Sequence, residues 1–541
     1  MVLVNLVAAG KQSDLLPGSL SRTCRPQRPA PLVWLAFLLP AILLASGCGG
    51  DDSNSTRTPT PAVTATPTAS PTTSPTTSPA ASPTPSPSPT SAASVINFSP
   101  AVITLNNPST ANPSTSPAAG HLAAVPIAVT VDLTAYDSKG NILLPSVANP
   151  MHVQVYGAPN GVITPIDTLI TSDTTVNFTY NGGFFPHNIE LAAWIDDPSG
   201  GAALGTTLFV QQNRPSCTYG TITYDADVIA TVPNPIHVNA VVGVDNPTTT
   251  DVAAFTIDTG SLGVVVPKSE LGPDIHGPGA PGLKFYDSSG LIFTGNYYLA
   301  PVSVELKDHT FVQTNPILVL AVDGVHCDPH HKGCVVPSNS KLHYLGVGFD
   351  RNSTGSGDLF NSPSENAFLE LTDAQNGTDI NQGYVLSTAG VMLGVTAANS
   401  SGFKLITLDP NSTVPGDWNP EPGCYQFTTL VGRPQFCGNL LLDVGIDEMF
   451  IDLSSDKRPA GSFDSNGRVP SGVGMNILAG SKSNPAMSYD FTVVQPPTTP
   501  VGAAPVFVQW VNVSKIFINT GRLPLLNFNY LYSGQCGQVG F

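Results

Sequence analysis

The chain has 541 residues, which is enough for two or three domains with sizeable cores. Charged residues make up only 11%, whereas Gly (50) and Pro (52) are abundant, and this composition favours β-structure with many turns over helices. The net charge of −17 argues against a nucleic-acid partner, because little positive charge is available to neutralise phosphates.

The first 48 residues are predicted to be a signal peptide with a lipobox. Arginines from Arg22 to Arg28 precede an apolar run over residues 31–44, which is short for a membrane span and ends in small residues. The sequence Leu-Ala-Ser-Gly before Cys48 resembles a bacterial lipobox, in which Cys48 would carry the lipid. Ordinary signal cleavage a few residues earlier is the alternative. Gly49 permits sorting away from the inner membrane, so we expect an exported lipoprotein on the outer membrane or cell surface.

Residues 49–94 are predicted to form a stalk. From Asp51 onward they are nearly all Thr, Ser, Pro and Ala, a composition that cannot form a core and that favours extended polyproline II structure. At about 3.1 Å per residue, the segment could reach on the order of 140 Å at full extension. The stalk would hold the rest of the chain away from a membrane surface.

Residues 95–212 are predicted to form an immunoglobulin-like β-sandwich. Apolar residues alternate with polar or small ones from Ile127 to Ala135 and from Ile189 to Ile195. Turn-forming residues follow each run, from Asp137 to Asn141 and from Asp197 to Gly200. The segment has no cysteine, so it lacks the inter-sheet disulfide of antibody domains. Nothing in it suggests catalysis, and we expect it to serve in spacing or adhesion.

The most informative motif is Asp258-Thr259-Gly260-Ser261. It follows the apolar run Phe255–Ile257 and precedes Val264–Val266, a pattern that predicts a buried strand, a tight turn and a second buried strand. Glycine at position 260 lets the backbone reverse beside the carboxylate, where a Cβ would crowd it. A single Asp-x-Gly sequence is nevertheless more typical of an ordinary β-turn.

A partial copy of this motif, Asp443-Val444-Gly445, begins 185 residues after Asp258. The apolar run Leu440–Leu442 precedes it, and Met449–Ile451 follows it at the same offsets as in the first copy. Each aspartate is also followed, roughly eighty residues later, by an apolar element that leads to a glycine. The sequence therefore indicates a diverged tandem duplication. Two such hairpins facing each other would hold two carboxylates close enough to share a water molecule.

With these motifs, residues from about Tyr219 to the C-terminus resemble the two-lobed, pepsin-like aspartic proteases. Residues 236–244 resemble the strand that enters the first lobe. Residues 285–290 lie where this family carries its flap, with Tyr286 in the place of the flap tyrosine. Residues 528–541 resemble the closing hairpin of the family.

The resemblance implies an all-β, bilobed acid-protease fold, with an N-terminal lobe over residues 213–400 and a C-terminal lobe over residues 401–541. It also implies an aspartic endopeptidase that hydrolyses peptide bonds with Asp258, Asp443 and a water held between them. Tyr286 on the flap would close over an extended peptide or protein substrate in the interlobe cleft. We expect no cofactor, no metal and a monomeric chain. The residues expected to support the catalytic pair are Thr259, Gly260, Ser261, Val444 and Gly445.

The second motif departs from the family pattern at Val444, where Thr or Ser is usual. Thr259 can form its half of the hydrogen bonds that join the lobes, whereas Val444 can only pack. Ser261 can orient Asp258, but Asp443 has no equivalent partner in its own motif, which weakens preorganisation of the pair. One alternative is therefore a catalytically inactive, peptide-binding surface lipoprotein with the same fold. A second is a structural lipoprotein that uses its sandwich and stalk in adhesion.

Six cysteines besides Cys48 belong to the expected mature chain, and all lie in the protease-like region. An even number in an exported protein predicts disulfides, with fifteen possible connectivities. Proximity in sequence favours Cys327–Cys334 and Cys424–Cys437, which leaves Cys217–Cys536. The resemblance supports this last pair, because pepsin-like folds bring the ends of the region together. Closing so long a loop should stabilise the fold by about 4–5 kcal/mol.

The segment from His326 to Cys334 contains His, Cys and Asp side chains that could bind zinc. Its spacing matches no common zinc site, and an oxidising compartment favours a disulfide. We therefore predict a disulfide-closed surface loop with solvated histidines.

Overall fold

The computed structural model describes residues 93–541 apart from residues 102, 106–126, 138, 157–162, 166, 173, 181–188, 196–203, 212–216, 218, 332–333, 338–341, 352–356, 374–377, 415 and 495–501. The predicted signal peptide, Cys48 and most of the stalk lie outside the described residues, as does the predicted turn at residues 197–200. The described residues form strands and short 3₁₀ helices, with no α-helix among them. None of their helices has the length and hydrophobicity needed to cross a membrane. The 3₁₀ helices are η1 (Lys268–Glu270), η3 (Pro363–Glu365), η4 (Ala367–Leu369), η5 (Ser455–Lys457) and η6 (Leu523–Leu526).

The strands before residue 212 form two five-stranded sheets that share one hydrophobic core. One sheet has the order β1-β3-β8-β6, with β4 paired to β3; its strands are β1 (Ala93–Ser99), β3 (Ile127–Asp137), β8 (Thr175–Tyr180), β6 (Ile163–Thr164) and β4 (Ile142–Leu143). The other has the order β2-β10-β9-β5-β7; its strands are β2 (Ile103–Leu105), β10 (Leu204–Gln211), β9 (Ile189–Ile195), β5 (Met151–Tyr156) and β7 (Asp167–Ile170). The first strand begins two residues before the predicted start at residue 95, and the immunoglobulin-like type stays a prediction.

Strand β3 shows how the sequence determines this part of the fold. Its alternating residues Val131, Leu133 and Ala135 are fully buried, as the period of two predicts. The strand ends where the carboxylate of Asp137 accepts hydrogen bonds of 2.8 Å from the backbone N–H groups of Lys139 and Asn141. The side chain thereby fixes the predicted turn.

The first lobe is built on a twelve-stranded sheet with the order β16-β17-β20-β15-β21-β14-β13-β18-β19-β22-β23, and β12 pairs with β13. Its strands are β12 (Val228–Ala230), β13 (His237–Val242), β14 (Ala253–Asp258), β15 (Leu262–Pro267), β16 (His276–Tyr286), β17 (Leu291–Ala300), β18 (Val302–Glu305), β19 (Phe311–Thr314), β20 (Ile317–Cys327), β21 (Tyr344–Val347), β22 (Leu371–Asp373) and β23 (Thr378–Asp379).

The second lobe is built on a seven-stranded sheet with the order β31-β30-β27-β28-β33-β29-β32. Its strands are β27 (Pro422–Phe427), β28 (Gln435–Leu441), β29 (Met449–Asp452), β30 (Gly474–Ser481), β31 (Asn484–Thr492), β32 (Val508–Val511) and β33 (Phe517–Asn519).

Both lobes contain the same unusual strand arrangement around their aspartate. In the first lobe, β21 lies between β14 and β15, parallel to the former and antiparallel to the latter. In the second lobe, β33 lies in the same way between β28 and β29. The inserted strands are the apolar elements that the sequence shows downstream of each aspartate. The repeated arrangement agrees with a tandem duplication.

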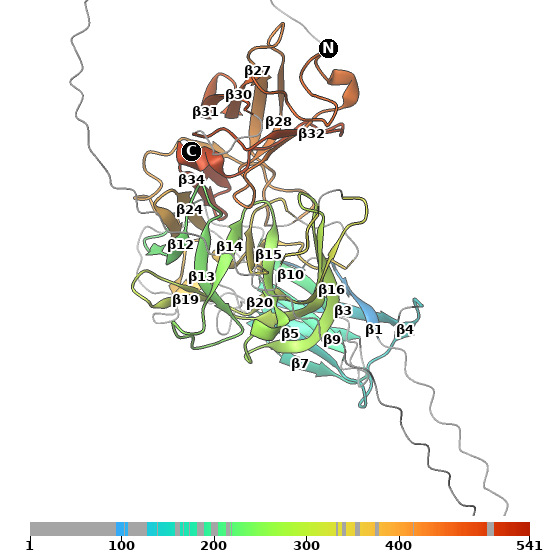
Figure 1. The fold of residues 1–541 in the computed structure, drawn as a ribbon. Coiled ribbons are helices and arrows are strands. Elements are labelled where there is room, and N and C mark those ends of the chain that lie inside the picture. Colours follow the sequence, from blue (N-terminus) through green and yellow to red (C-terminus); the bar gives the residue numbers. More distant parts are fainter. Residues whose placement is uncertain are drawn as a thin grey trace, which may run out of the picture. The chain divides into compact units, whose positions relative to one another are not determined.

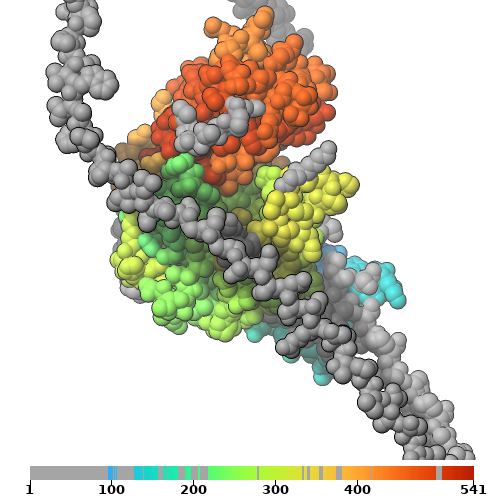
Figure 2. Space-filling model, viewed as in Figure 1, coloured from blue at the N-terminus to red at the C-terminus, as the bar shows by residue number. Residues whose placement is uncertain are grey.

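A six-stranded sheet joins the two lobes, with strands from both halves of the region. Its order is β11 (Tyr224–Asp225), β25 (Gly390–Leu393), β24 (Gly383–Ser387), β34 (Tyr530–Ser533), β35 (Gln538–Gly540) and β26 (Leu405–Thr407). Figure 1 shows β24 and β34 between the strands of the first lobe and those of the second. In Figure 2 the first lobe, green to yellow, lies against the second, orange to red. The protein therefore has the all-β, bilobed pepsin-like fold.

Three disulfides join the cysteines of this region. They link Cys217 to Cys536, Cys327 to Cys334, and Cys424 to Cys437. These are the three pairs that the sequence analysis favours. The first brings together residues 319 positions apart, beside the closing hairpin β34–β35. The bridges indicate an extracellular or secreted protein.

Candidate active site

Asp258 and Asp443 occupy equivalent turns in the two lobes. Asp258 is the last residue of β14, and Asp443 follows β28 by two residues. The N–H of Gly260 donates to Asp258 Oδ1 at 2.7 Å, and the N–H of Gly445 donates to Asp443 Oδ1 at 2.9 Å. Both aspartates are buried, with 7% and 5% of their surface exposed. The same backbone turn therefore fixes one carboxylate in each lobe.

The glycines of the two turns show that the turns face each other closely. A Cβ on Gly445 would lie 2.5 Å from Asp258 Oδ1, and a Cβ on Gly260 would meet the carboxyl group of Asp443 at less than 3.0 Å. Real Cβ atoms essentially never approach another atom within 3.0 Å. Each glycine therefore makes room for the carboxylate of the opposite lobe, and the two carboxyl groups are neighbours.

Thr259 links the two loops through its hydroxyl. The hydroxyl donates to the backbone C=O of Leu442 at 2.5 Å and accepts from the N–H of Val444 at 2.9 Å. The side chain of Val444 is fully buried and offers no hydroxyl in return. The structure thus contains the half of the interlobe link that was expected of Thr259 and lacks the half that a threonine at position 444 would supply.

A further hydrogen bond holds the second oxygen of each carboxylate. Ser261 Oγ donates to Asp258 Oδ2 at 2.6 Å, and Asn519 Nδ2 donates to Asp443 Oδ2 at 2.7 Å. The N–H of Gly521 donates to Asn519 Oδ1 at 3.1 Å, which orients the amide. Asn519 thus provides the partner that Asp443 lacks in its own motif. Sequence reasoning missed it, although it lies in the apolar element that leads to Gly521.

The surroundings of Asp443 favour its protonated form. Burial and then the charge of Asp258 raise the pKa of Asp443 well above the usual range of a carboxyl group. The hydrogen bonds from Asn519 and from the N–H of Gly445 favour the ionised form and offset part of this effect. Two carboxyl groups this close cannot both ionise easily, which favours a proton on Asp443.

A cleft of about 780 Å³ opens over the two aspartates. The flap hairpin β16–β17 lines it from the first lobe, with residues Leu283 to Ser289. Strands β29, β32 and β33 line it from the second lobe, with Phe450, Val511 and Phe517. Ile446, which directly follows Gly445, also contributes an apolar side chain. The cleft can therefore accommodate an extended chain between the flap and the second lobe.

Tyr286 lies at the end of the first flap strand, next to the aspartates. Its ring packs 5.2 Å from that of Phe293 and 5.4 Å from that of Tyr344, between centroids. Its hydroxyl is buried near Ser261 and Asp258 but makes no well-formed hydrogen bond with the described residues. Burial, and then the charge of Asp258, raise the pKa of Tyr286 well above its ordinary value. The hydroxyl therefore stays protonated and can donate a hydrogen bond.

The loop closed by Cys327–Cys334 differs in one respect from its prediction. His330 is exposed as expected, but His331 is half-buried because it packs against Gly290 of the flap turn, and it lines the cleft. Across the part of the chain that the structure describes, no group of three or more His, Cys, Asp or Glu side chains is arranged to hold a metal ion.

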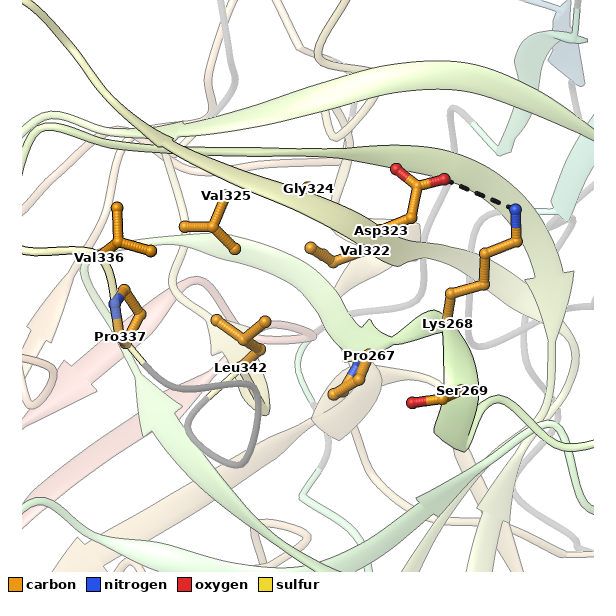
Figure 3. Close-up of a pocket in the computed structure, with 10 residues that line it drawn as sticks. All are labelled: Pro267, Lys268, Ser269, Val322, Asp323, Gly324, Val325, Val336, Pro337 and Leu342. Carbon is orange, nitrogen blue, oxygen red and sulfur yellow. Dashed lines mark ion pairs between the residues drawn. The ribbon is translucent and has the colours of Figure 1, made fainter. Parts of the chain in front are cut away.

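A second hollow, of about 590 Å³, is lined by residues of the first lobe that include neither Asp258 nor Asp443 (Figure 3). Its wall is mainly apolar, with Pro267, Val325 and Leu342 among the lining residues. Figure 3 shows an ion pair between Lys268 and Asp323 in this hollow. Lys268 Nζ lies 3.5 Å from Asp323 Oδ2, and both side chains are about half exposed. An exposed pair of this kind contributes little energy and no catalytic group, so this hollow is not the candidate site.

Comparisons with known proteins give limited information. No family model matches the chain, and no curated protein matches it. Among solved structures, it is similar to the crystal structure of basic 7S globulin from soybean, with 10% sequence identity and a TM-score of 0.38. The match covers 59% of this chain and 96% of the globulin.

Proposed function

We propose that the chain is an aspartic-type endopeptidase that hydrolyses peptide bonds with Asp258, Asp443 and a water molecule shared between them. The observation that carries the proposal is the pair of adjacent, buried carboxylates at the cleft, each fixed by two hydrogen bonds. Fixed groups of this kind need little reorganisation as charge develops during reaction.

The environment of each carboxyl group suggests its role. Asp443 holds the shared proton, because burial and the neighbouring charge raise its pKa. Asp258, oriented by Gly260 and Ser261, takes a proton from the water as the water oxygen bonds to the scissile carbonyl carbon. Asp443 gives its proton to the carbonyl oxygen, which produces a neutral diol. The C–N bond then breaks as Asp258 protonates the leaving nitrogen and the diol returns a proton to Asp443.

The flap would contribute to binding. Its buried, protonated Tyr286 hydroxyl can donate a hydrogen bond to a peptide in the cleft. A peptide under the flap would also exclude water from the aspartates.

Val444 favours a second candidate function, a peptide-binding protein with the same cleft and no catalysis. Apart from the two aspartates themselves, Thr259 is the one side chain among the described residues whose hydrogen bonds link the two loops, so the catalytic pair is held less firmly than two threonines would hold it. Digestion of a peptide library by the purified soluble part, from acidic to neutral pH, distinguishes the two. Cleavage that a transition-state-analogue inhibitor suppresses supports the endopeptidase, whereas peptide binding without cleavage at any pH supports the binding protein.

We also propose that the chain is a monomeric, exported bacterial lipoprotein on the outer membrane or cell surface. The three disulfides support export, and the sequence before Cys48 supports a lipid anchor. An immunoglobulin-like sandwich on a stalk would place the cleft away from the membrane, where it could reach peptide or protein substrates.

A further inference from the structure

Two of the carboxylates that line the cleft besides the catalytic pair already have partners. Asp358 forms an ion pair with Lys284 at 3.2 Å, and both side chains are at most 5% exposed. Asp350 accepts a hydrogen bond of 2.9 Å from Asn411 Nδ2. Both carboxylates are already bound by partners within the protein, so they are poorly available to bind a ligand.

Asp287 and Asp452 also line the cleft and differ in their exposure. Asp287 lies in the flap turn and is exposed, so water can solvate it. Asp452 is half-buried, and its carboxylate forms no hydrogen bond or ion pair with any described residue. Burial alone raises its pKa to about 6, with no opposing positive charge close enough to lower it. Asp452 is therefore desolvated in part and remains uncompensated.

Apolar side chains flank Asp452 on the sheet. Asp452 pairs with Phe517 of β33 on one side and with Val511 of β32 on the other. Cross-strand partners lie side by side on the same face of a sheet, so both side chains adjoin the carboxylate. Phe450, two residues earlier on β29, faces the same way. All four residues line the cleft.

This surface suits a long side chain with an apolar stem and a positive end. The methylene groups of lysine or arginine would pack on Phe450, Val511 and Phe517, while the cationic end would reach Asp452. The aromatic rings would add attraction for the cation. Arg351 also lines the cleft and already lies over one face of Phe517, with Cζ 5.4 Å from the ring centroid and its Nε donating to the backbone C=O of Phe349. It forms no ion pair with Asp452 and does not lower the pKa of that carboxyl group, so the charge of Asp452 stays available.

We infer that Asp452, with Phe450, Val511 and Phe517, forms a subsite that binds a lysine or arginine side chain of an extended peptide substrate. This inference rests on the proposed endopeptidase function, because the bound peptide is a substrate only if the protein cleaves it. Asp452 lies at the end of β29 that is farther from the catalytic loop. The basic residue should therefore lie two or more positions from the scissile bond.

The test measures peptide binding separately from cleavage. In an Asp258→Asn background, which should bind peptides without cutting them, fluorescence anisotropy compares labelled eight-residue peptides that carry lysine or norleucine at each position in turn. Norleucine retains the apolar stem and removes the charge. At one position, the peptide with lysine should have a Kd lower than that of the peptide with norleucine by on the order of tenfold, as expected for one charge-assisted contact.

Adding Asp452→Asn should abolish this preference, whereas adding Asp287→Asn, which removes an exposed carboxylate from the same cleft, should preserve it. Equal loss in both variants would assign the preference to the general acidity of the cleft and overturn the inference. Binding without a preference for lysine, or no binding of any peptide, would also overturn it. Cleavage by the unmodified protein is measured separately. If the peptides bind with the predicted preference but none is cut, the endopeptidase proposal fails and the subsite stands.

Discussion

The side-chain hydroxyl of Thr259 accepts a hydrogen bond of 2.9 Å from the backbone N–H of Val444, so one residue of the first lobe holds the Asp443 loop of the second. The same hydroxyl donates to the C=O of Leu442. The link uses the backbone of the second loop and does not need a hydroxyl at position 444. This explains how the two aspartates can lie together despite the valine.

Thr259→Val should therefore destabilise the protein. It preserves the shape of the side chain but leaves the buried N–H of Val444 and the C=O of Leu442 without a partner, at a cost of about 1–3 kcal/mol.

Val444→Thr should preserve activity or raise it, and one added hydrogen bond would stabilise the fold by about 0.5–1.5 kcal/mol. Urea denaturation of both variants measures these changes. An unchanged midpoint for Thr259→Val would show that the link carries no energy.

Asn519→Leu should change the pH dependence of cleavage. The amide hydrogen bond lowers the pKa of Asp443 because it favours the ionised form, so its loss should raise that pKa further. The alkaline limb of the kcat/KM profile, which reports loss of the shared proton, should then move to higher pH, with a lower maximum. A lower maximum without any shift of the limb would mean that Asn519 has only a structural role.

Glu421 should make the fold more stable in acid than at neutral pH. Its carboxyl oxygens are buried without a hydrogen-bond partner among the described residues, and burial raises its pKa to about 7 from an ordinary value of 4.5. A carboxyl group whose pKa is higher in the folded state stabilises that state below pH 4.5, and this contribution is lost as the pH rises to 7.

The contribution of Glu421 to the free energy of unfolding that is lost over this pH range is roughly 3 kcal/mol, at 1.36 kcal/mol per pKa unit. Glu421→Gln cannot ionise, so its unfolding free energy should fall less than that of the wild type between pH 5 and pH 8. Denaturant titrations of both proteins at several pH values measure the difference, and the comparison cancels the contribution of Asp443. Parallel pH dependence of the two proteins would refute the prediction.

Lipidation of Cys48 is testable without reference to the cleft. Mass spectrometry of the membrane fraction should find a mature chain that begins with an acylated Cys48. Cys48→Ala should release the protein from the membrane. A mature chain that begins at another residue, or one that Cys48→Ala leaves unaffected, would contradict the lipoprotein proposal.

The sequence predicts those parts of the site that depend on local patterns. The apolar strands around each Asp-x-Gly turn bury their side chains, and the glycines are required wherever these turns are placed. The sequence also predicts that the two aspartates belong to one site, because the apolar patterns that flank them repeat. The fold follows from the same duplication, since the inserted strands β21 and β33 arise from the apolar elements downstream of each motif.

The parts that the sequence could not predict depend on contacts between distant segments. Asn519 meets Asp443 across 76 residues, and nothing in its local pattern distinguishes it from an ordinary residue at the end of a strand. Lys284 and Asp358 are buried as a pair, although each alone would be expected at the surface. Asp452 alternates with buried residues on β29, but only the packing of the lobes shows that its face lines a cleft.

The proposed mechanism requires Asp258 and Asp443 to act together, and the most direct measurement of this requirement is kcat/KM for cleavage of a peptide library by the wild type, Asp258→Asn and Asp443→Asn. Neither carboxylate alone can both activate the water and protonate the carbonyl oxygen, so each substitution should lower kcat/KM by on the order of a thousandfold or more while the protein stays folded. If Asp443→Asn cleaves as fast as the wild type, the second motif is only a turn. If the wild type cleaves nothing and Val444→Thr restores nothing, the cleft is a peptide-binding site without catalysis.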